Sequence, residues 1–254
     1  MNKVTYVIPI WARTFEKDIL LSLNSLISES KYIEQIIIVH DGWESFTLDI
    51  NRMPKILEEK VLHIYSGINK GPGIARNYGC IFSKTNFIFF LDAGDESFPK
   101  RIEKQLPLVL RNGYAYGHIK EINSDGKECI KESVIEFKEA LKLLPYRAPF
   151  CNVTLAIKKD IFQDLKGFPN LRIAEDWVLM AKIMKRFLLV SVVDDALVKV
   201  NLGRDFIQRR RGIKISFNIL QALFCIKKVR LVPLYKLVIS SMIQIILRNL
   251  PAFV

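Results

Sequence analysis

The chain has 254 residues, of which half are hydrophobic and a quarter are charged, and its formal net charge is +12. This composition supplies a core for one or two folded domains and excludes an intrinsically disordered chain. The positive charge suits a polyanionic partner, but it does not choose between nucleic acid and an anionic membrane.

The first hundred residues alternate between short apolar runs and helical patterns. Runs rich in β-branched or aromatic residues predict buried strands at 4–10, 35–39, 61–65 and 87–91. Helical patterns fill the intervals at 18–30, 71–84 and, after Pro99, 100–110. This alternation indicates a mostly parallel sheet, in which ligands bind beyond the carboxyl ends of the strands. Because the first apolar run, 4–10, has only seven residues and no small-residue cleavage site follows it, no secretory signal peptide is expected.

The next hundred residues follow a looser order. A strand over 114–122 is followed by the hairpin-turn sequence Asn123-Ser124-Asp125-Gly126. The remaining patterns predict strands at 153–157, 188–193 and 196–200, and helices at 160–166 and 175–187. The four cysteines contain no C-x-x-C pair, so reduced thiols in a cytosolic protein are expected rather than a zinc site.

The last segment, 204–254, is strongly basic, with ten Lys or Arg and one acid. Two helical patterns in it are separated by Pro233, and a polar stripe runs along the second, formed by Lys236, Ser240, Gln244 and Arg248. The longest uncharged run, 215–226, is shorter than the ~20 residues that cross a bilayer. Each helix is therefore expected to lie in a membrane interface, or else to pack on protein.

Two carboxylates three residues apart, Asp92 and Asp95, directly follow the strand at 87–91. Such oxygens suit Mg²⁺ or Mn²⁺, which can neutralise the charge on a leaving diphosphate. The alternative interpretation is a strand-ending turn in which Asp92 caps the next helix.

Two other segments carry weaker signals. Gly71 and Gly73 would let backbone approach a ligand, with Arg76 on the following helical turn, although an exposed arginine at a loop-to-helix junction is equally ordinary. Glu175 and Asp176 open a helix, where the helix dipole favours acids, and one of them could instead be a general base.

Together, these segments resemble the family 2 glycosyltransferases, which have the GT-A fold. The resemblance covers nearly the whole chain and rests on five segments in order: VTYVIPI, IIIVHDG, NKGPGIARN, FIFFLDAGDESFP and GFPNLRIAEDWVLMAKI. It implies an α/β fold with a Rossmann-like, mostly parallel central sheet and flanking helices. The expected domains are a catalytic domain at 1–203, with a nucleotide-binding half at 1–95 and an acceptor-binding half at 96–203, and a basic, membrane-associating helical tail at 204–254.

The resemblance also implies which residues bind the nucleotide sugar. Pro9 and Ile10 would line the nucleoside pocket, and Asp41 would contact the base. Arg76 would lie near the base, and Asp92 would bind the ribose or the metal.

The chemistry that the resemblance implies is a metal-dependent, inverting transfer. Asp95, with Asp92, would bind Mn²⁺ or Mg²⁺. Asp176, next to Glu175, would be the catalytic base that takes a proton from the acceptor hydroxyl.

Three positions depart from the family pattern. His40 and Gly94 stand where the family often has acids, which leaves fewer carboxylates for the metal. No late histidine is present to assist the diphosphate, so Arg204 or the Arg209–Arg211 cluster would supply that positive charge.

The end of the chain, with Arg210-Arg211-Gly212 and its apolar helices, resembles that of bacterial polysaccharide transferases. It implies a hexosyltransferase that uses a nucleotide-diphosphate sugar, most simply a UDP-sugar. The acceptor would be a polyprenyl-diphosphate-linked oligosaccharide in O-antigen, lipopolysaccharide, capsule or exopolysaccharide assembly. The enzyme would be cytoplasmic and peripheral on the inner face of the cell membrane, with an anionic membrane surface and no nucleic acid as partner.

Three other functions are alternatives for this sequence. A nucleic-acid-binding protein would explain the basic tail, but the tail lacks the aromatic and Arg mixture that stacks on bases. A nucleotidyltransferase usually needs a glycine-rich loop after the first strand, and Ile10-Trp11-Ala12-Arg13 contains no glycine. An inactive relative that serves as a membrane-bound scaffold stays open because of His40 and Gly94.

Overall fold

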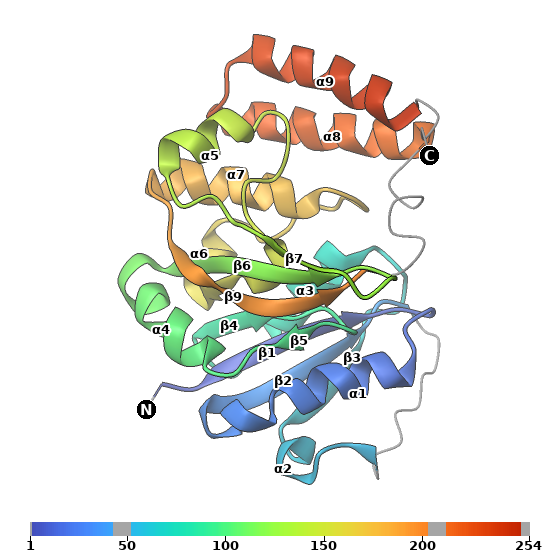
Figure 1. Ribbon diagram of the computed structural model, residues 1–254, viewed down its shortest axis with the longest axis vertical. Helices are drawn as coiled ribbons and strands as arrows, with labels where there is room; N and C mark the ends of the chain where they lie inside the picture. Colours follow the sequence, from blue (N-terminus) through green and yellow to red (C-terminus); the bar gives the residue numbers. More distant parts are fainter. Residues whose placement is uncertain (1, 43–51, 203–211, 250–254) are drawn as a thin grey trace.

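The computed structural model describes residues 2–42, 52–202 and 212–249 of the chain. A central sheet runs through the molecule, and helices lie on both of its faces (Figure 1). The strand order is β3-β2-β1-β4-β8-β6-β9-β5, and β7 pairs with β6 off this path.

The first half of the sheet is parallel and has the expected strands: β1 (Val4–Ile10), β2 (Ile33–His40), β3 (Val61–Tyr65) and β4 (Phe87–Phe90). Ile10 pairs with His40, which in turn pairs with Tyr65. β1, β2 and β3 therefore end together, β4 ends opposite Val7, and the segments that follow all four leave from one edge of the sheet.

The second half is mixed and contains β5 (Glu96–Ser97), β6 (Tyr114–Ile122), β7 (Glu128–Lys131), β8 (Ala156–Lys158) and β9 (Val192–Asn201). Strand β8 is antiparallel to both β4 and β6, whereas β6 and β9 are parallel. The hairpin predicted at 123–126 is confirmed by the antiparallel pairing of β6 with β7.

Successive strand residues bury into opposite faces of the sheet, which gives two hydrophobic cores. In β1, Val7 joins one core and Ile8 the other. The Ile8 core is covered by α1 (Glu16–Ser25), α2 (Lys55–Glu58) and α4 (Arg101–Asn112). The Val7 core is covered by α3 (Pro72–Ile81), α5 (Phe137–Leu143), α6 (Lys159–Asp164) and α7 (Glu175–Phe187).

Three element predictions were wrong in part. The predicted helix at 18–30 is α1 followed by a 3-10 helix at Ile27–Tyr32. The predicted strand at 153–157 begins instead with the 3-10 turn Asn152–Thr154. The predicted strand at 188–193 is mostly a loop, because Leu188, the residue after α7, has a left-handed φ of 52° and β9 starts only at Val192.

The tail forms the two expected helices, α8 (Ile213–Val229) and α9 (Leu234–Asn249). Four buried residues of α8 belong to the same core as α7: Ile219, Ala222, Leu223 and Ile226. The tail therefore packs on the rest of the protein through α8, which lies between α7 and α9 in Figure 1. In the parts of the chain that the structure describes, no helix is both long and apolar enough to span a membrane.

Candidate active site

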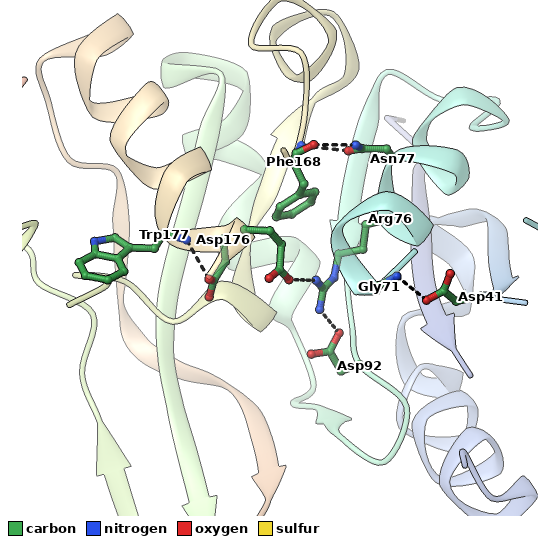
Figure 2. Close-up of polar contacts among 9 residues, drawn as sticks. Asp41, Gly71, Arg76, Asn77, Asp92, Phe168, Asp176 and Trp177 are labelled. Carbon is green, nitrogen blue, oxygen red and sulfur yellow. Dashed lines mark hydrogen bonds and ion pairs between the residues drawn. The ribbon is translucent and has the colours of Figure 1, made fainter. Parts of the chain in front are cut away.

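Asp41, the first residue after β2, holds the loop that leads into α3. Its carboxylate accepts the backbone N–H groups of Lys70 and Gly71, each at 2.8 Å, and its carbonyl oxygen accepts the Asn69 side-chain amide at 3.0 Å. Gly71, the residue before α3, has φ of 96°, a conformation that favours glycine. Figure 2 shows Asp41 facing Gly71. A contact between Asp41 and a nucleotide base stays a prediction.

Pro9 and Ile10 lie beside Asp41 at the same sheet edge. The backbone N–H of Asp41 donates to the carbonyl oxygen of Ile10 at 2.8 Å. The Ile10 side chain is buried in the core, whereas Pro9 is half-buried. A nucleoside in this place would therefore touch Pro9 and the Ile10 backbone rather than the Ile10 side chain, and that contact stays a prediction.

Arg76 joins the two acidic segments of the chain (Figure 2). Its Nη2 donates to Asp92 Oδ1 at 2.6 Å and its Nη1 donates to Glu175 Oε1 at 3.1 Å. The guanidinium also lies 5.5 Å from the centre of the Phe168 ring. Because Arg76 is only 4% exposed, the alternative of an exposed arginine at the start of α3 was wrong.

The charges in this cluster shift one another's protonation. Burial, together with the neighbouring Asp176, raises the pKa of Glu175 to about 7, against the opposing effect of Arg76. Burial lowers the pKa of Arg76, but the charges of Asp92 and Glu175 more than offset that effect, so this pKa lies above its usual value. Arg76 is thus a permanent cation between two acids, one of which titrates near neutral pH.

Further contacts fix the loop before α7 against α3. The Asn77 side chain donates to the Phe168 carbonyl at 2.8 Å and accepts the Phe168 N–H at 2.9 Å. Arg172 donates to the side chain and backbone oxygens of Asn69, both at 3.1 Å. Gly73 lets this loop approach, since a Cβ there would lie 2.6 Å from Glu175 Cγ. Sequence reasoning missed Asn77 and Arg172, because only folding brings their partners near.

Asp176 stands beside Glu175 at the start of α7. Its Oδ1 accepts the backbone N–H of Trp177 at 2.8 Å, and Trp177 Nε1 donates to the Leu144 carbonyl at 2.8 Å. The preceding Ala174 has φ of 61°, so the chain turns sharply into the helix there. The half-buried Asp176 is thereby presented at the positive end of the α7 dipole.

The loop at 92–95 is fixed from behind by α1. Ser22 Oγ lies 2.8 Å from the Asp95 carbonyl oxygen and 3.0 Å from the Gly94 N–H. Gly94 has φ of 96°, which explains a glycine in the middle of this acidic segment. On the other side, the Asn201 side chain donates to the Gly94 carbonyl at 2.8 Å.

The two carboxylates of this loop differ in exposure. Asp95 is buried, and this burial, followed by the charge of Asp92, raises its pKa well above the usual range. Asp92 is half-exposed and already pairs with Arg76. Within the described residues, no three His, Cys, Asp or Glu side chains gather in a way that could hold a metal. Mg²⁺ is commonly bound by only one or two protein carboxylates, with the other ligands supplied by substrate phosphates and water. Asp92 and Asp95 fit a cation bound in that way.

A buried arginine that no sequence motif marks supports the loop at 92–95. Arg101 is completely buried, and its Nη2 donates to the carbonyl oxygens of Phe90 and Val153 at 2.9 and 3.1 Å. It therefore fixes the end of β4, two residues before Asp92. Arg204 and the Arg209–Arg211 cluster lie outside the described residues.

The family comparison covers most of the chain. The sequence model described as Glycosyl transferase family 2 matches residues 5–166. The amylovoran biosynthesis glycosyltransferase AmsE of Erwinia amylovora is 27% identical over 198 residues, which are 75% of this chain and 73% of that protein. A UDP-Gal:alpha-D-GlcNAc-diphosphoundecaprenol beta-1,3-galactosyltransferase of Escherichia coli is 23% identical over 236 residues, 91% of this chain and 85% of that protein.

Solved structures show the same fold. TarS of S. aureus in complex with UDP aligns with 96% of this chain and 70% of its own, with a TM-score of 0.65 and 17% identity. The same protein in complex with UDP-GlcNAc aligns with 88% of this chain and 66% of its own, with a TM-score of 0.64. The α/β fold expected from the sequence is confirmed, and the chain belongs to glycosyl transferase family 2.

Proposed function

We propose that this glycosyltransferase moves a hexose from a UDP-sugar to a polyprenyl-diphosphate-linked oligosaccharide, with inversion, in the assembly of a bacterial surface polysaccharide such as O-antigen. The observation that carries the proposal is the cluster in which Arg76 joins Asp92, in the loop after β4, to Glu175, at the start of α7. This cluster brings the nucleotide-side strands next to the acid pair that would act on the acceptor.

The relatives support the choice of donor and acceptor. One has a name that specifies UDP-Gal and a diphosphoundecaprenol acceptor, and TarS has been solved with UDP-GlcNAc. Another acts in amylovoran biosynthesis, and an O-antigen biosynthesis glycosyltransferase of Escherichia coli, WbnJ, is 27% identical over 173 residues. A lipid-linked acceptor would place the enzyme at the inner face of the cell membrane.

The proposed reaction is one displacement. Asp176 takes the proton of the acceptor hydroxyl, and the acceptor oxygen forms a bond to the anomeric carbon of the sugar. The bond from that carbon to the phosphate oxygen breaks on the opposite face, and the nucleoside diphosphate leaves with the electron pair. One base suffices for this step, and Glu175 acts as a positioning residue because its carboxylate is held by Arg76.

Asp92 and Asp95 would hold Mn²⁺ or Mg²⁺ together with the donor diphosphate. The cation would stabilise the negative charge that develops on the leaving diphosphate. In this arrangement Asp92 would bind the metal and also keep its hydrogen bond with Arg76. Binding of the donor at the loop 92–95 would therefore be coupled, through Arg76, to the position of Glu175.

The test is release of nucleoside diphosphate by the purified protein with Mn²⁺ and a panel of nucleotide sugars. Each donor is measured with and without an undecaprenyl-diphosphate-linked GlcNAc acceptor. Release from one donor, increased by the acceptor, is expected, and NMR of the product should show inverted anomeric configuration. If donors bind but none is consumed with any lipid-diphosphate acceptor, the transfer proposal fails and the scaffold alternative gains support.

A further inference from the structure

Among the residues that the structure describes, protein covers the outermost helix, α9, on one side only. In Figure 1 it lies at the edge of the molecule, on the side of α8 away from α7. Within α9 only Leu237 and Ser240 are buried. No other described part of the chain covers the opposite side of the helix.

The polar stripe of α9 faces the protein. Ser240 is completely buried, and Gln244 donates to the Tyr146 carbonyl at 2.8 Å. Arg248 donates to Gln244 at 3.1 Å, and Asn249 donates to the Ser216 hydroxyl of α8 at 3.0 Å. Gln244, Arg248 and Asn249 therefore make their hydrogen bonds within the protein.

The outward face is apolar, which reverses the usual polarity of a surface helix. A stripe of exposed side chains at helical spacing runs along it: Tyr235, Ile239, Met242 and Ile246. Met242 is 62% exposed and Ile246 is 57% exposed, and further exposed apolar residues flank the stripe: Val238, Ile243, Ile245 and Leu247. A continuous apolar face of this kind marks a surface that another molecule or a membrane covers.

Charge selects an anionic membrane over a second copy of the chain. Residues 212–249 contain no acid and six basic residues: Lys214, Lys227, Lys228, Arg230, Lys236 and Arg248. Four of them, Lys214, Lys227, Lys228 and Arg230, are exposed on α8 or at its end. Two copies of this acid-free, basic tail would repel each other, whereas anionic lipid headgroups complement its charge.

We propose that the outward face of α9 is a membrane-binding surface that inserts between the headgroups of an anionic bilayer. The helix has 16 residues, so it lies along the interface and does not cross it. The inference deepens the proposed function, since it names the surface that brings the site to a lipid-held acceptor. Only α8 separates α9 from α7, so the helix that begins with Glu175 and Asp176 lies roughly 20 Å from the headgroups, two helix-packing distances.

The experiment is flotation of the full chain with vesicles of phosphatidylcholine, alone or mixed in equal parts with phosphatidylglycerol. The wild type is expected to float with the mixed vesicles and to bind neutral vesicles more weakly. The variant Ile239→Ser/Met242→Ser/Ile246→Ser should lose affinity for the mixed vesicles on the order of tenfold or more. Because these side chains are exposed, the variant should fold, which circular dichroism checks.

The matched control removes exposed apolar side chains elsewhere, in Ile56→Ser/Ile81→Ser/Ile130→Ser, and should float like the wild type. Lys227→Glu/Lys228→Glu should weaken binding to the mixed vesicles only. Unchanged flotation of the α9 variant, or wild type that stays with the unbound protein, would overturn the inference. The inference would also be overturned if the wild type were a dimer and the α9 variant a monomer, with the same flotation for both.

Activity separates this inference from the proposed function. The α9 variant should keep wild-type transfer to a short-chain, detergent-free acceptor and lose transfer to an acceptor embedded in vesicles. Normal flotation with no transfer to either acceptor would contradict the proposed function and leave the membrane-binding surface intact.

Discussion

Replacing Arg76 with Met should strongly destabilise the fold, because Arg76 is the counter-charge of a buried acid. The change removes the hydrogen bonds to Asp92 and Glu175. Asp92 is half-exposed and can turn to water, but Glu175 is only 6% exposed and would remain next to Asp176 with no cation. Loss of one partner of a buried ion pair costs about 3–5 kcal/mol, and proton uptake by Glu175 offsets part of it, so about 3 kcal/mol is expected near neutral pH.

The loss of stability in Arg76→Met should depend on pH, because Glu175 titrates near neutral pH. The pKa of Glu175 already lies at about 7, and loss of Arg76 should raise it further. A carboxyl whose folded pKa exceeds its unfolded value contributes stability at low pH, and this is lost as pH rises through the folded pKa. The difference in stability between Arg76→Met and wild type should therefore be smaller near pH 5 than at neutral pH and above.

The assay is urea denaturation followed by circular dichroism. Arg172→Met is the matched control, because the exposed Arg172 also donates two hydrogen bonds, and it should cost less than about 1 kcal/mol. The double variant Arg76→Met/Glu175→Gln should recover about 1–2 kcal/mol relative to Arg76→Met. A loss below about 1 kcal/mol in Arg76→Met, independent of pH, would refute the reasoning.

Three other predictions concern His40, Gly73 and the divalent cation. Burial, and then the neighbouring His63, lowers the pKa of His40 to about 4, so stability should fall by about 2 kcal/mol as the pH drops from 6.5 towards 4, and His40→Asn should flatten that slope in urea titrations. Gly73→Ala would place a Cβ 2.6 Å from Glu175 Cγ, so about 1–3 kcal/mol of destabilisation and a lower kcat are expected, and unchanged kinetics would contradict the packing argument. Removal of divalent cations with EDTA should abolish diphosphate release, and Mn²⁺ or Mg²⁺ should restore it, whereas activity in EDTA would exclude the metal role of Asp92 and Asp95.

The parallel half of the fold could be predicted from local pattern. Each of its strands is a short β-branched or aromatic run. Outside that half, the apolar spacing also predicts the helix that begins at Glu175 and ends at Phe187. The segment at 188–191 is as apolar as a strand, but a left-handed residue at Leu188 turns the chain first. Apolar composition alone cannot distinguish that loop from a strand.

The site could be predicted as a set of segments but not as a set of contacts. Asp41, Asp92 and Glu175 each stand after a strand or at a helix start, which the sequence shows directly. The bridge from Arg76 to both Asp92 and Glu175 joins residues 16 and 99 positions apart, and no local pattern specifies it. The sequence likewise could not predict that the polar stripe of α9 faces the protein, because a helical pattern does not show which face of the helix packs on the protein.

The central claim is that Asp176 removes the proton from the acceptor, and Asp176→Asn tests it most directly. The measurement is the rate of acceptor-dependent diphosphate release, with donor affinity determined by calorimetry on the same preparations. Asp125→Asn, in the exposed hairpin turn, is the control and should match wild type. The account predicts that Asp176→Asn loses about 10²–10⁴-fold in rate and binds the donor normally. Transfer within a few-fold of wild type would contradict it.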